Sequence, residues 1–326
     1  MAEHNEARIV GYLTADPIIR DEKSTDEDGT ERLEYAKCYL HVETVRRSVQ
    51  ACTMSRYSNI LVFYDVSEAS GNEWKMKLLK KIRSLKKGDV VSIKGVVVIQ
   101  NTMQSRRCKH CGKIITNPTT MAFVYPIDLI KLTSYSHLID QKAGENALNY
   151  KDDEKAKAVM RNNAIYGLAE ANRRLIENYY EFSNTVTLLG YVVNQPKLVS
   201  GASGDDHCQY QVAVGRKYYI VTDAEQKTDF PWVYTFGEQC QRDMERIIPP
   251  DKEKGETGTE VLMSAAMIQS YPRKKIICPV CNEVNETTLV KTEFVPYSVE
   301  YLENYVKDEK TDDDEEKVAN SVLSFF

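Results

Sequence analysis

The sequence lacks most of the features that mark enzymes, membrane proteins and secreted proteins. Its 326 residues include only five histidines, and no P-loop, G-x-S-x-G, H-E-x-x-H or G-x-G-x-x-G motif appears. Apolar runs are short, the mean hydropathy is −0.46, and the first residues form no basic and apolar leader. We therefore expect no catalytic activity, no membrane span and a cytoplasmic location.

The acidic charge is confined to one end of the chain. The formal net charge is −5, and residues 308–326 alone hold seven acidic and two basic residues. Residues 1–307 are therefore neutral as a whole. The pI of about 5.7 does not exclude a nucleic-acid partner, because local patches decide that interaction.

The chain contains two copies of one module, since three landmarks recur in the same order. The pairs of matching segments are Ile9–Pro17 with Leu188–Pro196 (offset 179), Asn59–Asp65 with Pro231–Gly237 (offset 172), and Cys108-x-x-Cys111 with Cys278-x-x-Cys281 (offset 170). Pro126 and Pro296 keep the spacing of 170. The offsets drift slowly, which is typical of a duplicated domain.

Each copy has the pattern of five strands with one helix. In the first copy the segments rich in Val, Ile, Tyr and Thr are Ala7–Leu13, Glu34–Arg46, Asn59–Val66, Val90–Gln100 and Thr120–Leu132. A helix with Trp74 on its apolar, core-facing stripe precedes Gly88. This is the order of the OB-fold, a small Greek-key barrel whose sheet face and loops bind oligonucleotides.

We accordingly expect a mainly β chain with helices, divided into four parts. These are an OB-fold with a Cys-x-x-Cys hairpin (1–133), a helical linker (134–183), a second such OB-fold (184–306) and a flexible acidic tail (307–326). The linker helix would span Asp152–Tyr180 and act as a strut or an oligomerisation helix. A short helix is expected over Tyr297–Val306.

Several segments resemble the bacterial single-stranded DNA-binding protein family. Gly11–Arg20 resembles its G-x-L-x-x-D-P-x-x-R turn, Lys87–Gly95 its K-G-x-x-V-x-I-x-G segment, and Trp232–Gly237 its third strand. The acidic tail with a terminal Phe resembles its partner-recruiting tip. Bacterial members usually have one OB-fold and no Cys-x-x-Cys, so the resemblance implies a divergent branch, from a phage or mobile element.

The resemblance implies a protein that coats single-stranded DNA in replication, recombination or repair, near the nucleoid of a bacterial or phage-infected cell. The tail would recruit replication or recombination proteins, and its acid would compete with DNA when no partner is bound. The tail residues expected to bind partners are Asp312, Asp313, Asp314, Glu315, Glu316, Phe325 and Phe326.

Single-stranded nucleic acid is held by aromatic faces within a basic groove. Alternate residues of a strand share a face, so Phe230, Trp232, Tyr234 and Phe236 would form one row, which we interpret as a stacking platform. The alternative is that this row is the core. The matching row of the first copy would be Ile60, Val62 and Tyr64, which predicts less stacking there.

Basic and aromatic residues fall where OB-fold loops would present them to phosphates. The candidates are Arg46, Arg47, Arg56 and Tyr57 in the first copy, Arg216, Lys217, Tyr218 and Tyr219 in the second, and Arg106, Arg107, Arg273, Lys274 and Lys275 before the cysteine pairs. For each single residue, a solvated surface charge is an equally good interpretation.

The two Cys-x-x-Cys pairs predict structural zinc, because four thiolates complete a tetrahedral site. Either Cys108, Cys111, Cys278 and Cys281 share one Zn²⁺, or each pair recruits other ligands. Redox-active disulfides are a further alternative. His110 has Val280 as its counterpart and is not counted as a ligand.

Two other classes of function stay open at this point. The chain could be an RNA-binding or transcription-associated zinc module, or a structural subunit that forms homo-oligomers through the linker helix and the zinc hairpins. Preference for DNA over RNA would separate the first hypothesis from the second, and failure to bind either would favour the third.

Overall fold

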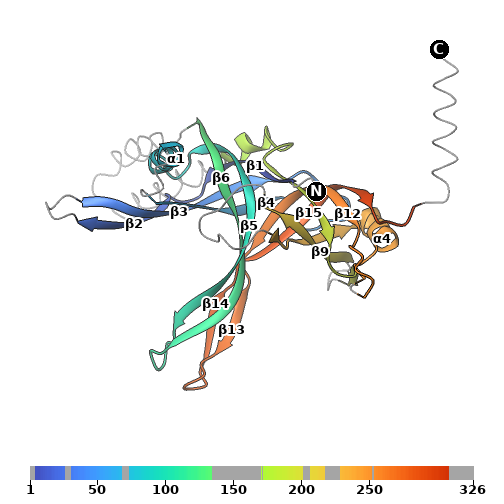
Figure 1. The fold of residues 1–326 in the computed structure, drawn as a ribbon. Helices are drawn as coiled ribbons and strands as arrows, with labels where there is room; N and C mark the ends of the chain where they lie inside the picture. The colour runs from blue at the N-terminus through green and yellow to red at the C-terminus, as the bar shows by residue number, and fades with distance from the viewer. Residues whose placement is uncertain are drawn as a thin grey trace, which may run out of the picture.

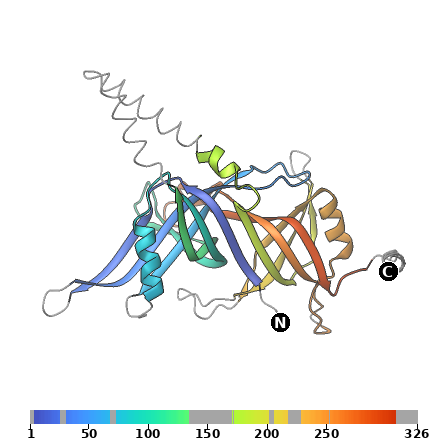
Figure 2. The same ribbon diagram turned by 90° about the horizontal axis from the view of Figure 1, so that it is seen from above.

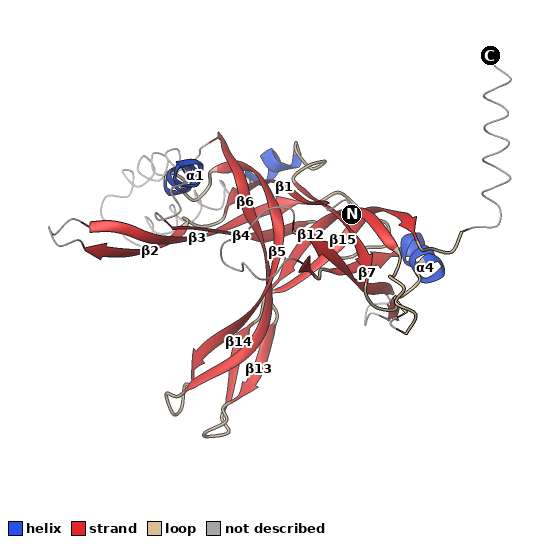
Figure 3. Cartoon of the chain, viewed as in Figure 1, coloured by secondary structure: helices blue, strands red, loops and turns tan. Residues whose placement is uncertain are grey.

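The computed structural model describes residues 4–25, 31–67, 73–133, 170, 172–200, 206–216, 228–251 and 253–307. Strands dominate these residues, as Figure 3 shows, which confirms the mainly β prediction. Residues 308–326 and most of the predicted linker helix lie outside the described residues. None of the helices within the described ranges is long and apolar enough to cross a membrane.

The first copy forms a closed barrel of five strands. These are β1 (His4–Leu13), β3 (Glu31–Val45), β4 (Tyr57–Ser67), β5 (Val90–Arg107) and β6 (Ile114–Thr133). β1 pairs with β5, β5 with β6, β6 in parallel with β4, β4 with β3, and β3 again with β1. The sequence did not predict β2 (Ile18–Thr25), which pairs with the outer part of β3 as an extended hairpin (Figure 1).

The second copy repeats this order of strands, and most of its buried apolar residues form one continuous hydrophobic core with those of the first copy. Its elements are β7 (Asn184–Val192), β8 (Lys197–Val199), β9 (His207–Gly215), β10 (Thr228–Asp229), β11 (Trp232–Phe236), α4 (Gly237–Arg246), β12 (Glu260–Ser270), β13 (Arg273–Ile277), β14 (Val284–Thr288) and β15 (Lys291–Glu303). β11 and β15 form the parallel pair. The expected helix over Tyr297–Val306 is wrong, because β15 continues to Glu303 and its backbone stays paired with β12.

A helix follows the third strand in both copies. α1 (Glu73–Arg83) buries Leu78, Leu79 and Ile82 against the first barrel. Trp74, predicted as a core residue of this helix, is 44% exposed, because it lies in the first turn, one turn before the first buried residue of the helix. Five strands closed by one parallel pair, with a helix between the third and fourth strands, make each copy an OB-fold.

The two barrels are joined edge to edge through their first strands. β1 and β7 pair antiparallel, and Ala7 lies opposite Val186, its own counterpart at the offset of 179. Pairing of equivalent residues is what a two-fold axis requires, so the halves are related by a pseudo-two-fold axis at this pair. Figure 2 shows the barrels side by side, with α1 on one and α4 on the other.

Two asparagines and two glycines recur at equivalent positions of the copies, because each supports a close contact between strands of its barrel. The side-chain amide of Asn5 exchanges two hydrogen bonds with the backbone of Val97, each of 2.9 Å, and Asn184 does the same with Met267. Gly11 and Gly190 are needed for close approach, because a Cβ atom would lie 2.3 Å from Glu43 O and 2.1 Å from Ala213 O. The repeat therefore preserves the contacts that close each barrel.

The hairpins between the fourth and fifth strands extend well beyond the barrels. We call residues 101–120 and 271–290 the two arms. Figure 1 shows both arms projecting from the same side of the molecule. They are joined near their roots, since Gln104 donates to Thr288 O at 3.0 Å and accepts from the Thr287 hydroxyl at 3.2 Å. The arms bring the two Cys-x-x-Cys turns together at their tips.

Candidate nucleic-acid interface

The aromatic row on β11 lies outside the barrel core, but only part of it is open. Val233 points into the core and is fully buried, while Phe230 and Trp232 are 44% and 38% exposed. Tyr234 and Phe236 are only 7% and 3% exposed. The predicted platform is therefore reduced to its first two rings.

Tyr234 and Phe236 are covered by a loop of the other copy. They form a small apolar cluster with Ala266, Ile268 and Val295, against which Val49, Cys52 and Met54 pack from the loop between β3 and β4. The ring of His207 lies 5.5 Å from that of Tyr234 and 5.7 Å from that of Phe236. The prediction that Tyr234 and Phe236 are open to stacking is therefore wrong, because the loop of the other copy covers both rings.

The strand pairing also corrects the alignment of the two third strands. Val62 pairs with Val124, and Val233 pairs with Phe294. Residues 124 and 294 correspond at an offset of 170, so the third strands correspond at 171 rather than 172. A shift of one residue moves every side chain to the other face of a strand. Trp232 therefore corresponds to Leu61.

Tyr64 consequently belongs to the core of the first barrel. It is fully buried, as are Ile60 and Val62, and its hydroxyl donates to Lys75 O at 2.8 Å. The prediction that Tyr64 stacks on a base is wrong, and the cause is the one-residue error in alignment.

Two of the predicted phosphate contacts are buried arginines that support loops. Arg46 is 2% exposed, and its guanidinium donates to the carbonyls of Arg47, Met54 and Ser55. Arg216 forms a two-point ion pair with Asp229, at 2.6 and 2.7 Å. Both side chains of this pair are almost fully buried. Arg46 and Arg216 therefore do not face a nucleic acid.

The remaining basic and aromatic residues predicted in the loops differ in their contacts with the rest of the protein. The guanidinium of Arg47 lies 3.9 Å from the centre of the Tyr297 ring and 3.4 Å from Glu181. Tyr57 donates to Glu177, near the end of the linker, whereas Arg56 is exposed. Lys217, Tyr218 and Tyr219 lie outside the described residues.

The arms carry the densest basic charge among the predicted sites. Arg107, Arg273, Lys274 and Lys275 are exposed, and Arg106 is partly exposed. Together the two arms contain seven basic and two acidic residues. Four thiolates around a divalent cation would add two negative charges at the tip and still leave the arms positive. The arms are thus a basic projection on a chain whose formal net charge is −5.

The four cysteines of the two pairs meet in one cluster at the arm tips. The Sγ atoms of Cys108 and Cys281 are 3.7 Å apart, as are those of Cys111 and Cys278, and all four lie within 4.8 Å of one another. Tetrahedral coordination with Zn–S bonds of about 2.3 Å places the sulfurs about 3.8 Å apart. The cluster has the donor set and the spacing of a four-cysteine metal site shared by the two copies.

Backbone N–H groups lower the pKa values of Cys108 and Cys278, whereas at Cys281 the backbone N–H of Glu283 is outweighed by burial and the neighbouring cysteines, which raise its pKa. The backbone N–H of Cys111 and then the side-chain amide of Asn285 lower the pKa of Cys108 to about 6. Asn285 donates to Cys108 Sγ at 3.4 Å and accepts from the backbone N–H of Lys109 at 3.0 Å. Thiolates are the form that binds metal. The sequence analysis did not identify Asn285, because its counterpart Ile115 breaks the repeat.

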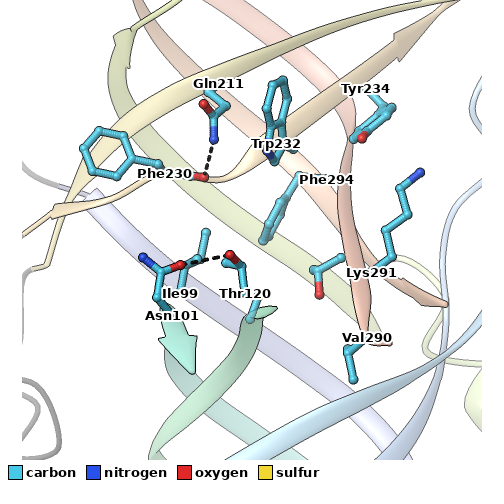
Figure 4. Close-up of a pocket in the computed structure, with 12 residues that line it drawn as sticks. Ile99, Asn101, Thr120, Gln211, Phe230, Trp232, Tyr234, Val290, Lys291 and Phe294 are labelled. Atoms are coloured by element: carbon cyan, nitrogen blue, oxygen red, sulfur yellow. Dashed lines mark hydrogen bonds between the residues drawn. The ribbon is translucent and has the colours of Figure 1, made fainter. Parts of the chain in front are cut away.

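A cavity of about 550 Å³ opens at the root of the arms, beside the exposed aromatic rings. Figure 4 shows Phe230, Trp232 and Phe294 from the second copy facing Ile99 and Thr120 of the first. Polar side chains on its rim are already paired, since Thr120 donates to Asn101 at 2.9 Å and Gln211 to Phe230 O at 3.3 Å. The cavity combines aromatic walls with polar groups, as small-molecule sites do.

No protein-family model matches this chain, and no curated protein matches it by sequence. Solved structures do match it. The wild-type single-stranded DNA binding protein from Thermus aquaticus is 12% identical with a TM-score of 0.49, over 94% of this chain and 97% of that one. A deletion mutant of it is 13% identical with a TM-score of 0.48, over 95% and 100%. A mitochondrial single-stranded DNA binding protein from S. cerevisiae is 13% identical with a TM-score of 0.25, over 37% and 95%.

Proposed function

We propose that this protein binds single-stranded DNA without reading its sequence and protects it during replication, recombination or repair. The observation that carries the proposal is the position of the exposed rings of Phe230 and Trp232 beside the root of two basic arms, on OB-fold barrels. Bases would stack on the rings, each contributing about 1–3 kcal/mol, while the arms follow the phosphates. This is a binding function and needs no catalytic group.

A titration with unstructured poly-dT at several salt concentrations tests this function. A W74F background leaves Trp232 as the single tryptophan, and its emission should be quenched by stacked bases. The logarithm of the affinity should fall with the logarithm of the salt concentration, with a slope of about −0.7 for each phosphate contacted. Absence of quenching and of binding at low salt would refute the proposal and favour a structural assembly role.

Charge variants separate the arms from the rest of the surface. Replacing Arg107, Lys274 and Lys275 by Gln should weaken binding and make the salt slope shallower by about 2, since each phosphate that is no longer neutralised changes the slope by about 0.7. The matched control replaces three lysines of α1, Lys77, Lys80 and Lys81, by Gln, and its slope should stay unchanged. An equal effect of both triple variants would show that only net charge matters. Tighter binding to RNA than to DNA of equal length would favour the RNA-binding alternative.

The four-cysteine cluster is proposed to hold one structural Zn²⁺. Of the metals that accept four thiolates, zinc has no redox chemistry and suits a purely structural site. Its role would be to fasten the arms of the two copies together, so that their basic strands present one surface.

The same proposal assigns roles to the parts of the chain. Residues 1–133 and 184–306 are the binding modules, 134–183 connects them, and 307–326 recruits replication or recombination proteins. Its acidic residues would compete with DNA for the basic surface when no partner is bound. Deleting residues 308–326 should strengthen DNA binding and abolish partner recruitment; unchanged values for both would remove the tail from the mechanism.

A further inference from the structure

The pseudo-two-fold axis relates the cavity at the root of the arms to a second position, which is filled by a glutamine. There the Gln269 carboxamide accepts from the backbone N–H of Leu61 at 2.7 Å and donates to the carbonyl of Ala122 at 2.7 Å. Gln269 is only 6% exposed. One amide thus satisfies a donor on the third strand and an acceptor on the fifth strand of the first barrel.

In the open cavity, an aliphatic residue stands where this glutamine would be. The counterpart of Gln269 is Ile99, at the offset of 170, and Ile99 lines the cavity. The counterparts of Leu61 and Ala122 are Trp232 and Thr292, which also line it. An isoleucine has no amide, so the side chain at this position cannot pair with the backbone of those two residues.

The strand register directs these two backbone groups away from their antiparallel neighbours. Val212 N–H donates to Pro231 O, so the next pair, Trp232 with Gln211, is a non-hydrogen-bonded pair. The N–H of Trp232 therefore points away from β9, toward the β15 side. Gln269 N–H donates to Ser58 Oγ instead of to β15. Thr292, opposite Gln269, accordingly turns its carbonyl away from β12, toward β11.

The pseudo-two-fold relation therefore assigns to the cavity a backbone donor, the N–H of Trp232, and a backbone acceptor, the carbonyl of Thr292, as the counterparts of the two groups that the Gln269 carboxamide joins in the other half of the molecule. We propose that the cavity binds one unpaired nucleobase, whose adjacent hydrogen-bond acceptor and N–H take the place that the Gln269 carboxamide has there, with the face of the base against Trp232. The inference rests on the proposed function. The proposal adds a specific base-binding site to the stacking platform. The cavity, with a volume of about 550 Å³, accommodates a base.

This arrangement would explain how the protein selects single strands. Each of the four bases has an adjacent donor and acceptor on its pairing edge, so the site would accept any base. In a duplex that edge is already hydrogen-bonded to the opposite strand. A site that uses the pairing edge is therefore closed to paired bases, whereas a site that contacts only phosphates is not.

The test uses the full-length protein and the variant Ile99→Gln, which installs at this position the side chain that fills the counterpart. The matched control is Ile99→Val, which changes the same side chain but adds no amide. The probes are oligo-dT and an oligonucleotide of the same length made of N3-methylthymidine, in which the base keeps its ring but loses the N–H of the pairing edge. Thermal melting confirms that each variant is folded.

We expect wild-type protein and Ile99→Val to bind oligo-dT about 5- to 100-fold more tightly than the methylated oligonucleotide, the range expected when a buried backbone acceptor loses its hydrogen bond. Ile99→Gln should bind both probes equally and as weakly as wild-type protein binds the methylated one. Equal binding of both probes by wild-type protein would overturn the pocket and leave the proposed function intact. Equal weakening by the Gln and Val variants would also overturn it. Failure of wild-type protein to bind oligo-dT would refute the proposed function itself.

Discussion

The shared metal site leads to a prediction of stoichiometry that two separate sites could not satisfy. Replacing one cysteine by serine in either copy, as in C111S or C278S, removes one of the four thiolates that meet at the arm tips. If the four share one ion, the wild-type chain binds one Zn²⁺ and each variant loses it. Two independent sites would instead give two ions for the wild-type chain and one for each variant.

The magnitude follows from the geometry of the cluster. The two cross-copy Sγ distances of 3.7 Å already match the edge of about 3.8 Å expected for tetrahedral zinc, so binding requires little rearrangement. Binding free energies of about 10–16 kcal/mol are typical of structural four-ligand sites at neutral pH. Zinc should therefore stay bound through purification and be removed only by a strong chelator.

The assay is elemental analysis of the purified protein, together with the thiolate-to-metal absorption of the Co²⁺-substituted form. C52S is the matched control, because Cys52 lies in the loop between β3 and β4, away from the arm tips, and this variant should retain one ion. Two ions for each wild-type chain, or one ion retained in C111S, would refute the shared site.

Three further predictions concern polar contacts within each copy and between the first copy and the linker. D229A should lower the free energy of unfolding by about 3–5 kcal/mol in urea titrations, because it leaves the buried guanidinium of Arg216 without a carboxylate to balance its charge; an effect below about 1 kcal/mol would contradict this. N184L and N5L should each lower the free energy of unfolding by about 2–5 kcal/mol, because each leaves a buried backbone N–H and a buried backbone C=O without a hydrogen bond, at about 1–3 kcal/mol per group. T185L, on the same strand as Asn184, is the control. Burial alone would raise the pKa of Glu43, but hydrogen bonds from Arg173 and Tyr12 lower it. Its contribution to stability is therefore present above pH about 4.3 and is lost as the pH falls through the lower folded-state pKa. E43Q should flatten the unfolding free energy over that acid range, and an unchanged pH profile would exclude this contact as a cause.

The repeat made much of the architecture predictable from the sequence. Two copies with five strands each, and two Cys-x-x-Cys turns at equivalent hairpins, predict both the OB-fold order and a site that the copies can share. Cys108 and Cys278 do meet at the arm tips. What the repeat cannot supply is the way the two barrels join, because pairing of β1 with β7 depends on strand edges rather than on any motif.

The candidate binding residues were less predictable, for two physical reasons. A β-strand alternates its faces, so an alignment error of one residue between Leu61 and Trp232 was enough to exchange the core row with the outer row, which misplaced Tyr64. Arginine also serves as a multiple donor to backbone carbonyls. Arg46 supports its loop in that way and looks the same in the sequence as an arginine that faces a phosphate.

The differences between the copies carry information that the similarities do not. In a dimer of identical chains, a two-fold axis makes equivalent positions identical, so both cavities at the arm roots would be open or both would be filled. Fusion of the two copies into one chain removes this constraint. Gln269 can then close one position and stabilise the seam, while Ile99 leaves the other open beside Trp232. The duplication thus allows one half of the molecule to specialise in holding the barrels together and the other in contacting a ligand.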